Sequence, residues 1–400
     1  PMPSGPEYEG AQAQVTPGGT DWFDAIFDPA DVTNVSISAS GGSEEGRYYL
    51  SANYLKQDGV IIGNTGFERV GTRLNSDFKI GDKITVSESL SITYDKEGTV
   101  SGNAIQNAAF SSPLVPVYDT NGNFAGTYSN AARVGIANNP VADLIRGQDD
   151  YNKNLRVIGD ISFKWQITPE LSFKSQAGVT MRDLNGRYFT ALNPEHGEAI
   201  SNNTLREQSF RQDQWVVSNI LNYKNSFGDH TLDVLVATEA TKENFKGFGA
   251  LRTNYLFEDE SFYLLSNGAG VPVIDYGNAS SNSIFSLLGT ANWSYGGKYF
   301  GQLTVRKDDT SRFAKATSDA IFPSGNLSWI ASNEDWFNST VFDTLKFRLS
   351  YGELGNQSIG IANADINISG LSEATGSYVF AGSGGATAGA VIASKGNPLL

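Results

Sequence analysis

The chain has 400 residues, a formal net charge of −14, two methionines and no cysteine. The missing cysteines exclude a disulfide framework, a thiolate metal site and a cysteine nucleophile, and the acidic balance argues against a nucleic-acid binder. No apolar run approaches the roughly 20 residues of a membrane-spanning helix. The strands of a membrane β-barrel escape this hydropathy test, because every second residue in each strand is polar.

Apolar residues that recur at every second position predict about twelve antiparallel strands. In chain order these strands cover 35–40, 48–54, 69–80, 84–94, 161–167, 171–181, 215–223, 232–236, 285–295, 299–305, 327–329 and 345–351. We expect each strand to have roughly 9–14 residues, the length that a tilted membrane strand needs.

The predicted connections alternate between short and long. The short ones lie near 41–46, 81–82, 168–170, 224–229, 296–298 and 332–342, the last with a helical turn. The long ones lie near 58–67, 96–153, 184–210, 243–282, 307–320 and from 355 onward. A barrel with short turns at one rim and long loops at the other produces this parity, whereas the connections of a Greek-key sandwich do not sort by end.

The hairpin at 161–181 has one apolar face and one polar face. Ile161 and Trp165 lie on the apolar face of its first strand, and Phe173 and Val179 on that of its second. We expect this face to meet lipid, where an Arg or Lys at mid-depth would cost about 2–4 kcal/mol. The polar face would then line a water-filled lumen, with Lys164, Gln166, Lys174, Arg69, Arg73, Asp77 and Arg306.

Aromatic residues gather beside the predicted short turns. They are Trp165, Phe173, Tyr223, Phe227, Trp293, Tyr295, Tyr299 and Phe347. Amphipathic rings favour the lipid–water interface, so this clustering indicates an aromatic girdle, although aromatic residues are also good strand formers in any sheet.

Candidate catalytic groups are few. His196 and His230 each fall in a predicted loop or turn, where a lone histidine is usually a solvated side chain. The acidic pairs and runs at 149–150, 258–260 and 308–309 could act as glycosidase carboxylates, but in long loops such runs are usually solvated charge. We therefore predict no enzyme, no catalytic residue and no cofactor.

Two further motifs have features of ligand sites. The stretch DTNGN at 119–123 alternates side-chain oxygens as calcium loops do, but it lacks the downstream glutamate, so a β-turn is the favoured interpretation. The glycine-rich run at 381–390 has no phosphate-binding pattern and is expected to be a mobile or bulged outer segment. No metal ligand is predicted.

Several segments in order resemble the SusC/RagA family of TonB-dependent outer-membrane transporters. The segment at 20–61, from TDWFDAIF to YLKQDGVI, is similar to the first barrel strands of that family, and FERVGTRLNSDFKI at 67–80 to the strand that follows. The other matching segments are SPLVPVYDTNGNFAGTY (112–128), NPVADL (139–144), FPSGNLSWIASNEDWF (322–337), LKFRLSYGELGNQ (345–357) and GNPLL (396–400). The middle loops match no part of the family pattern.

The resemblance implies an all-β, antiparallel, up-and-down transmembrane barrel of 22 strands with long extracellular loops, of which this chain supplies about 12–14. Residues 1–33 would lead from an N-terminal plug into the barrel, and residues 34–400 would form the partial barrel. The plug and the TonB-contacting segment would precede residue 1. The implied function is TonB-dependent import across the outer membrane of a Gram-negative bacterium, together with a SusD-like lipoprotein that caps the extracellular mouth.

The cargo stays open between an oligosaccharide and a peptide, and no substrate-binding residue is assigned. A secreted β-sandwich or adhesin is the alternative from another class, since it would keep the strands but bury the apolar face under a second sheet. An isolated wall of this size would leave two open strand edges, which lipid does not tolerate. We therefore expect residues 1–400 alone not to close into a stable pore.

Overall fold

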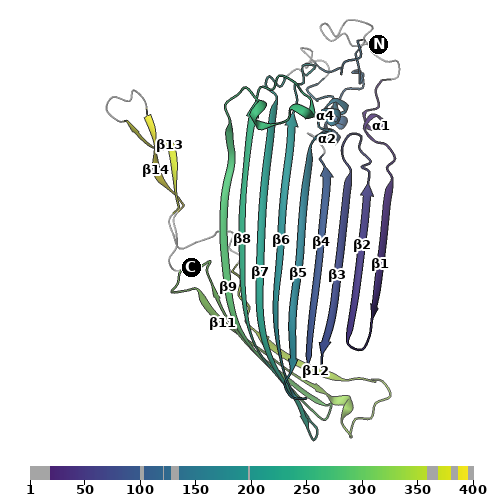
Figure 1. Ribbon diagram of the computed structural model, residues 1–400, viewed down its shortest axis with the longest axis vertical. Helices are drawn as coiled ribbons and strands as arrows, with labels where there is room; N and C mark the ends of the chain where they lie inside the picture. The colour runs from purple at the N-terminus through teal and green to yellow at the C-terminus, as the bar shows by residue number, and fades with distance from the viewer. Residues whose placement is uncertain are drawn as a thin grey trace.

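Twelve strands form one antiparallel sheet in which each strand pairs with its neighbours in sequence, from β1 to β12 (Figure 1). The computed structural model describes residues 19–99, 103–119, 121–127, 135–196, 199–357, 368–379 and 386–394. The strands are β1 (Val32–Gly42), β2 (Gly46–Gln57), β3 (Phe67–Ile80), β4 (Ile84–Gly98), β5 (Tyr151–Gln166), β6 (Leu171–Thr190), β7 (Thr204–Phe227), β8 (His230–Thr253), β9 (Val273–Tyr295), β10 (Tyr299–Thr310), β11 (Asp319–Ile330) and β12 (Lys346–Gly352). This up-and-down order confirms the predicted fold class.

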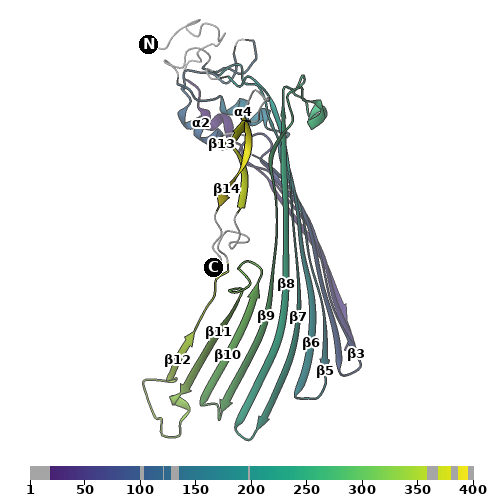
Figure 2. The same ribbon diagram turned by 90° about the vertical axis from the view of Figure 1, so that its left-hand side faces the viewer.

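The sheet curves into part of a cylinder, and β10–β12 turn behind the front strands in Figure 1, as the turned view in Figure 2 also shows. Strands β1 and β12 stand at the two ends of the pairing order and do not pair with each other. The described part of the chain is therefore an open wall with two strand edges, as expected. A separate two-stranded ribbon joins β13 (Ile368–Val379) and β14 (Ala386–Ser394).

Short and long connections alternate as predicted from β1 to β11. The connection between β11 and β12, which was predicted to be short, spans 331–345 and is longer than the connection at 311–318, which was predicted to be long. Gly81, Gly228, Gly296 and Gly297 stand in the tight turns at one rim with positive φ, a region that glycine occupies without steric cost. The connection after β11 is the longest at this rim and begins with a single 3-10 turn, η3 (Ala331–Asn333), where a helical turn was expected.

The predicted strand length of roughly 9–14 residues is wrong for the middle of the sheet. Strands β5 to β9 have 16, 20, 24, 24 and 23 residues, and they continue into 184–210 and 243–282, which were predicted to be loops. The face that is apolar lower in these strands becomes largely polar in the extensions, and several aromatic residues stand on the opposite face. The alternation of apolar and polar residues is therefore lost while the backbone ladder continues.

The small helices gather at the rim of the long connections (Figure 1). They are α1 (Trp22–Ile26), α2 (Ala104–Phe110) and α4 (Pro140–Arg146), with η1 (Glu260–Phe262) and η2 (Leu265–Asn267) in the connection between β8 and β9. Among the described residues, none of the helices has the length and apolar character needed to cross a bilayer.

The sandwich alternative is wrong, because no second sheet within the described part of the chain covers the apolar face. Ile161 is 54% exposed and Trp165 is 42% exposed, although both lie on the apolar side of β5. The largest buried side chains lie instead in clusters among the connections at the rim of the long loops.

Candidate functional site: the two faces of the sheet

Apolar side chains form a belt across one face of the sheet, which we call the apolar face. On β6 the belt runs from Leu171 to Met181, and at mid-height the register places Val217 of β7 between Ala177 of β6 and Ala240 of β8. Ten residue steps at about 3.3 Å each, in a strand tilted by about 40°, give a band about 25 Å tall. This height matches the hydrocarbon layer that a barrel must span.

Aromatic rings border the lower edge of the belt, next to the short turns. Neighbouring strands bring Tyr295, Tyr299, Trp329 and Phe347 into a continuous row, with centroid separations of 6.2, 6.5 and 5.7 Å. Farther along the rim, Trp165 and Phe173 are direct cross-strand partners. The clustering predicted from the sequence is therefore confirmed, and it includes Trp329 as well.

The opposite face, which we call the polar face, carries paired and hydrogen-bonded polar groups. Nε of Arg306 lies 2.7 Å from Oδ1 of Asp308, and its Nη2 donates to Oγ of Ser286 at 2.8 Å. Lys164 and Lys174 are direct cross-strand partners on this face. The residues predicted to line a lumen thus lie on the face opposite the belt.

Helices α1, α2 and α4 pack into a small cap at the rim of the long connections. Trp22 and Ile26 of α1 are buried there against Ala108 of α2 and Leu144 of α4. Trp22 also donates its indole N–H to the carbonyl oxygen of Ser112 at 3.1 Å. Segments more than 80 residues apart in the sequence are thereby joined above the end of the sheet.

An ion pair ties the cap to the connection between β6 and β7. Both terminal guanidinium nitrogens of Arg146 in α4 donate hydrogen bonds to the carboxylate of Glu195, whose side chain is only 5% exposed. Beside this pair, burial raises the pKa of Asp143 to about 6, although the amide of Asn107 donates to its carboxylate. Burial likewise raises the pKa of Asp150, at the start of β5, to about 6.

Comparison with known proteins gives consistent matches over most of the chain. No family model matches. The chain is 29% identical over 355 residues to TonB-dependent receptor P3 of Formosa agariphila, a match that covers 86% of the chain and 35% of that receptor. It is 27% identical over 375 residues to TonB-dependent receptor SusC of Bacteroides thetaiotaomicron, with 87% of the chain and 36% of that receptor covered. The chain thus spans about a third of the length of these curated relatives.

Solved structures show the same fold. The RagAB peptide transporter superposes with a TM-score of 0.75 at 23% identity, over 95% of this chain and 42% of that one. The chain resembles the barrel of SusC/RagA-type TonB-dependent receptors. Its location is the outer membrane of a Gram-negative bacterium, and its named relatives are receptors and transporters rather than enzymes.

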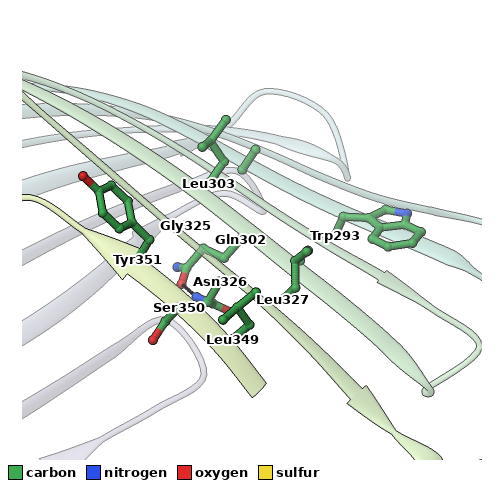
Figure 3. A pocket seen from close by; sticks show the side chains of 11 residues that line it. Trp293, Gln302, Leu303, Gly325, Asn326, Leu327, Leu349, Ser350 and Tyr351 are labelled. Atoms are coloured by element: carbon green, nitrogen blue, oxygen red, sulfur yellow. Dashed lines mark hydrogen bonds between the residues drawn. The ribbon is translucent and has the colours of Figure 1, made fainter. Parts of the chain in front are cut away.

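In this SusC/RagA-like wall the apolar face meets lipid and the polar face meets the lumen. An apolar hollow of about 510 Å³ lies on the lipid side near Leu303, Leu327 and Leu349 (Figure 3). The hollow exists because Gly301 and Gly325 place no side chain there, and it is apolar enough for an acyl chain. It is therefore not a site for a water-soluble cargo.

Glu88 is an exception on the lipid side. It faces outward on β4 next to Ser76 of β3, which donates a hydrogen bond to it at 2.9 Å. The register continues to Ile161 of β5, so this carboxylate lies within the height of the belt. The structure offers no cation partner for Glu88 among the described residues.

The two candidate histidines lie at opposite rims, whereas the candidate carboxylate runs at 149–150 and 258–260 come close together around Arg187. His196 lies in the connection between β6 and β7, with Nε2 at 2.6 Å from the carbonyl oxygen of Ile136. His230 is the first residue of β8 rather than part of a turn, and its ring stacks on that of Phe227. In the described part of the chain, no cluster of three or more His, Cys, Asp or Glu could hold a metal ion.

The DTNGN turn and the carboxylates have structural roles. Nη2 of Arg187 joins two of the acidic runs, because it donates to the carbonyl oxygen of Asp149 at 3.2 Å and to Oε1 of Glu260 at 2.5 Å. Asp119 accepts hydrogen bonds from the backbone N–H groups of Asn121 and Asn123, which is the turn predicted in preference to a calcium loop. Asp259 caps η1 by accepting from the N–H of Ser261. Asp308 pairs with Arg306 on the polar face. Parts of three sequence motifs lie outside the described residues. They are residues 120 and 128 of the segment 112–128, residues 381–385 of the glycine-rich run, and GNPLL at 396–400.

Sequence reasoning missed a group of aromatic residues on the lumen side above the belt. They are Tyr188, Phe210, Phe245 and Tyr276, from β6, β7, β8 and β9. A signal was present in the sequence, since Gly247 and Gly249 alternate on β8 at positions that face these rings. Glycine in a strand interior often marks a close approach of another group.

Proposed function

We propose that the full-length protein imports a large nutrient across the outer membrane in a TonB-dependent manner. A single curved wall with an outer apolar belt about 25 Å tall and an inner polar face carries this proposal. The curated relatives are named TonB-dependent receptors, which agrees with this activity.

The described wall is one part of such a transporter. We propose that residues 1–33 lead from a plug into the barrel and that residues 34–400 supply about half of its strands. Import needs a plug, because an open lumen of this size would otherwise leak. A plug that TonB pulls would admit cargo only when energy is supplied.

A SusD-like surface lipoprotein is the proposed partner at the extracellular mouth. The structurally similar RagAB is described as a peptide transporter, which supports a peptide as cargo. The oligosaccharide alternative rests on the resemblance of the sequence to the SusC/RagA family. Strands of 20–24 residues, such as β6 to β8, reach well beyond the belt and would carry the mouth away from the bilayer.

The test measures uptake in the source organism with the gene deleted and then restored, in cells with and without functional TonB. We expect uptake of one class of large nutrient to require both the gene and TonB. Purification of the full-length protein in mild detergent should also recover a surface lipoprotein at constant ratio. Uptake that is unchanged by loss of TonB would overturn the proposed function.

A further inference from the structure

We infer that Phe210, Phe245, Tyr188 and Tyr276 form an aromatic platform on the lumen wall that binds the pyranose rings of an oligosaccharide. The inference rests on the proposed function, because it names the cargo class of that import. It concerns a pocket of about 420 Å³ on the polar face of β5–β8 that also contacts Asn152 and Gln208.

The rings lie flat because glycines beneath them make room. A Cβ atom added to Gly247 would meet Cδ1 of Phe210 at 2.8 Å, and one added to Gly249 would meet Cε1 of Tyr276 at 2.5 Å. Both glycines are buried, while the two rings are half-exposed. The rings therefore cover the β8 backbone and turn their other side to the lumen.

The platform is continuous from strand to strand. The rings of Phe210 and Tyr276 have centroids 5.3 Å apart with planes 16° from parallel, and the ring of Phe245 lies 6.1 Å from that of Phe210. The faces of aromatic rings carry negative charge density, and the axial C–H groups of a pyranose ring are weakly positive. A sugar ring can thus stack on this surface.

Amide groups and one guanidinium line the pocket beside the rings. The guanidinium is that of Arg182, whose Nε donates to Oδ1 of Asn154 at 3.0 Å. The hydroxyl of Tyr188 donates to Oδ1 of Asn152 at 2.5 Å and accepts from Nε2 of Gln208 at 2.8 Å. The hydroxyl of Tyr276 donates to Oε1 of Gln208 at 3.5 Å. These amides keep further N–H donors, which suit the hydroxyl groups of a sugar.

The surroundings favour a sugar over a peptide. An extended peptide is commonly bound by pairing with a free strand edge, but the backbones of β7, β8 and β9 are already paired in the sheet on both sides. Phe210 lies five residues beyond Trp215, which marks the upper end of the belt on β7, or about 17 Å along the strand. The platform is thus above the bilayer, where cargo from outside would pass.

The experiment uses the full-length transporter purified with its partner. It measures retention of two labelled pools, one of oligosaccharides of mixed linkage and one of tryptic peptides. The test variants are Phe210→Ala and Tyr276→Ala, with Phe248→Ala as the control, because Phe248 lies on the outward side of β8 and is 54% exposed. We expect the wild type to retain oligosaccharides, and each test variant to retain them about tenfold less.

A second pair of variants separates loss of the rings from loss of the fold. Gly249→Ala should displace the Tyr276 ring and weaken retention, whereas Gly277→Ala on β9 meets open space and should not. Oligosaccharide retention that survives in Phe210→Ala and Tyr276→Ala would overturn the platform, and so would retention of peptides alone. TonB-dependent uptake is scored separately, so either result leaves the proposed import standing.

Discussion

Arg146 and Glu195 form a two-pronged ion pair, with Nη1 at 2.6 Å from Oε1 and Nη2 at 3.0 Å from Oε2. The pair joins α4 to the connection between β6 and β7, and the ring of Phe124 lies 5.2 Å from the guanidinium carbon. A charged group that loses its partner in such a site keeps the cost of leaving water. This pair therefore fixes the cap on the wall.

The substitution Glu195→Gln should loosen the cap. It leaves the Arg146 guanidinium without a charged partner, and we expect the local opening free energy to fall by about 2 kcal/mol. Hydrogen exchange of the α4 amides in the full-length protein measures this change. Asp77→Asn is the control, because its pair with Arg47 is exposed and contributes little. Equal protection of α4 in both variants would contradict the role given to Glu195.

Burial of Asp143 predicts a dependence of cap stability on pH. Its pKa is raised from 3.8 to about 6, so the folded cap favours the protonated carboxyl. The stability that this group contributes is present below about pH 4 and is lost as pH rises through about 6. Asp143→Asn, which is neutral throughout, should increase protection of α4 at pH 8 and change it little at pH 4.

Hydrogen exchange corrected for its intrinsic pH dependence measures this effect. The control is Asp24→Asn, since Asp24 is exposed on α1. Asp150 titrates with the same sign, so the difference between wild type and Asp143→Asn isolates the contribution of Asp143. A variant with the same pH profile as the wild type would show that the Asp143 carboxyl stays ionised.

Glu334 holds the longest connection at the short-turn rim. Its carboxylate accepts from the hydroxyl of Tyr299 at 2.6 Å, from the indole of Trp329 at 3.0 Å and from Nζ of Lys298 at 3.0 Å. These bonds lower its pKa from 4.5 to about 2, so their stabilisation is present above about pH 4.5 and is lost as pH falls through about 2.

The substitution Glu334→Gln should make residues 331–345 more accessible to protease at neutral pH, because an amide accepts from these donors less strongly. Limited proteolysis in detergent measures this. Asp335→Asn is a matched control, since the Asp335 side chain is fully exposed and lies 3.6 Å from the same Lys298. Similar cleavage rates in the two variants would mean that Glu334 does not hold the connection.

The strands that cross the belt could be predicted because most positions keep the alternation of apolar and polar residues, with exceptions such as Glu88. The extensions beyond the belt could not be predicted, because the polar residues Arg211 and Gln212 lie on opposite faces of β7 and give no alternation there. The platform around Phe210 was missed for a related reason, because an aromatic residue on the polar side breaks the pattern only locally. The cap depends on contacts such as that of Trp22 with Ser112, which no short-range pattern encodes.

An arginine introduced at one of two neighbouring positions at mid-height of the belt tests whether each face of β7 tolerates a charge. Val217→Arg puts a charge into lipid and should cost about 2–4 kcal/mol, so the full-length barrel should lose its heat-modifiable band. Ser218→Arg faces the lumen, within reach of Glu239, and should assemble normally. Normal assembly of Val217→Arg would contradict the depth assigned to the belt.

The most direct test measures whether each face of β7 is in contact with lipid or with water. Single cysteines at Val217 and Ser218 would be introduced into a cysteine-free full-length transporter, spin-labelled, reconstituted in lipid and exposed to oxygen and to a water-soluble nickel complex. We predict that the label at 217 is relaxed mainly by oxygen, which concentrates in lipid, and the label at 218 mainly by the nickel complex. Relaxation of the 217 label by nickel, with oxygen dominant at 218, would place the apolar face in water and contradict the account.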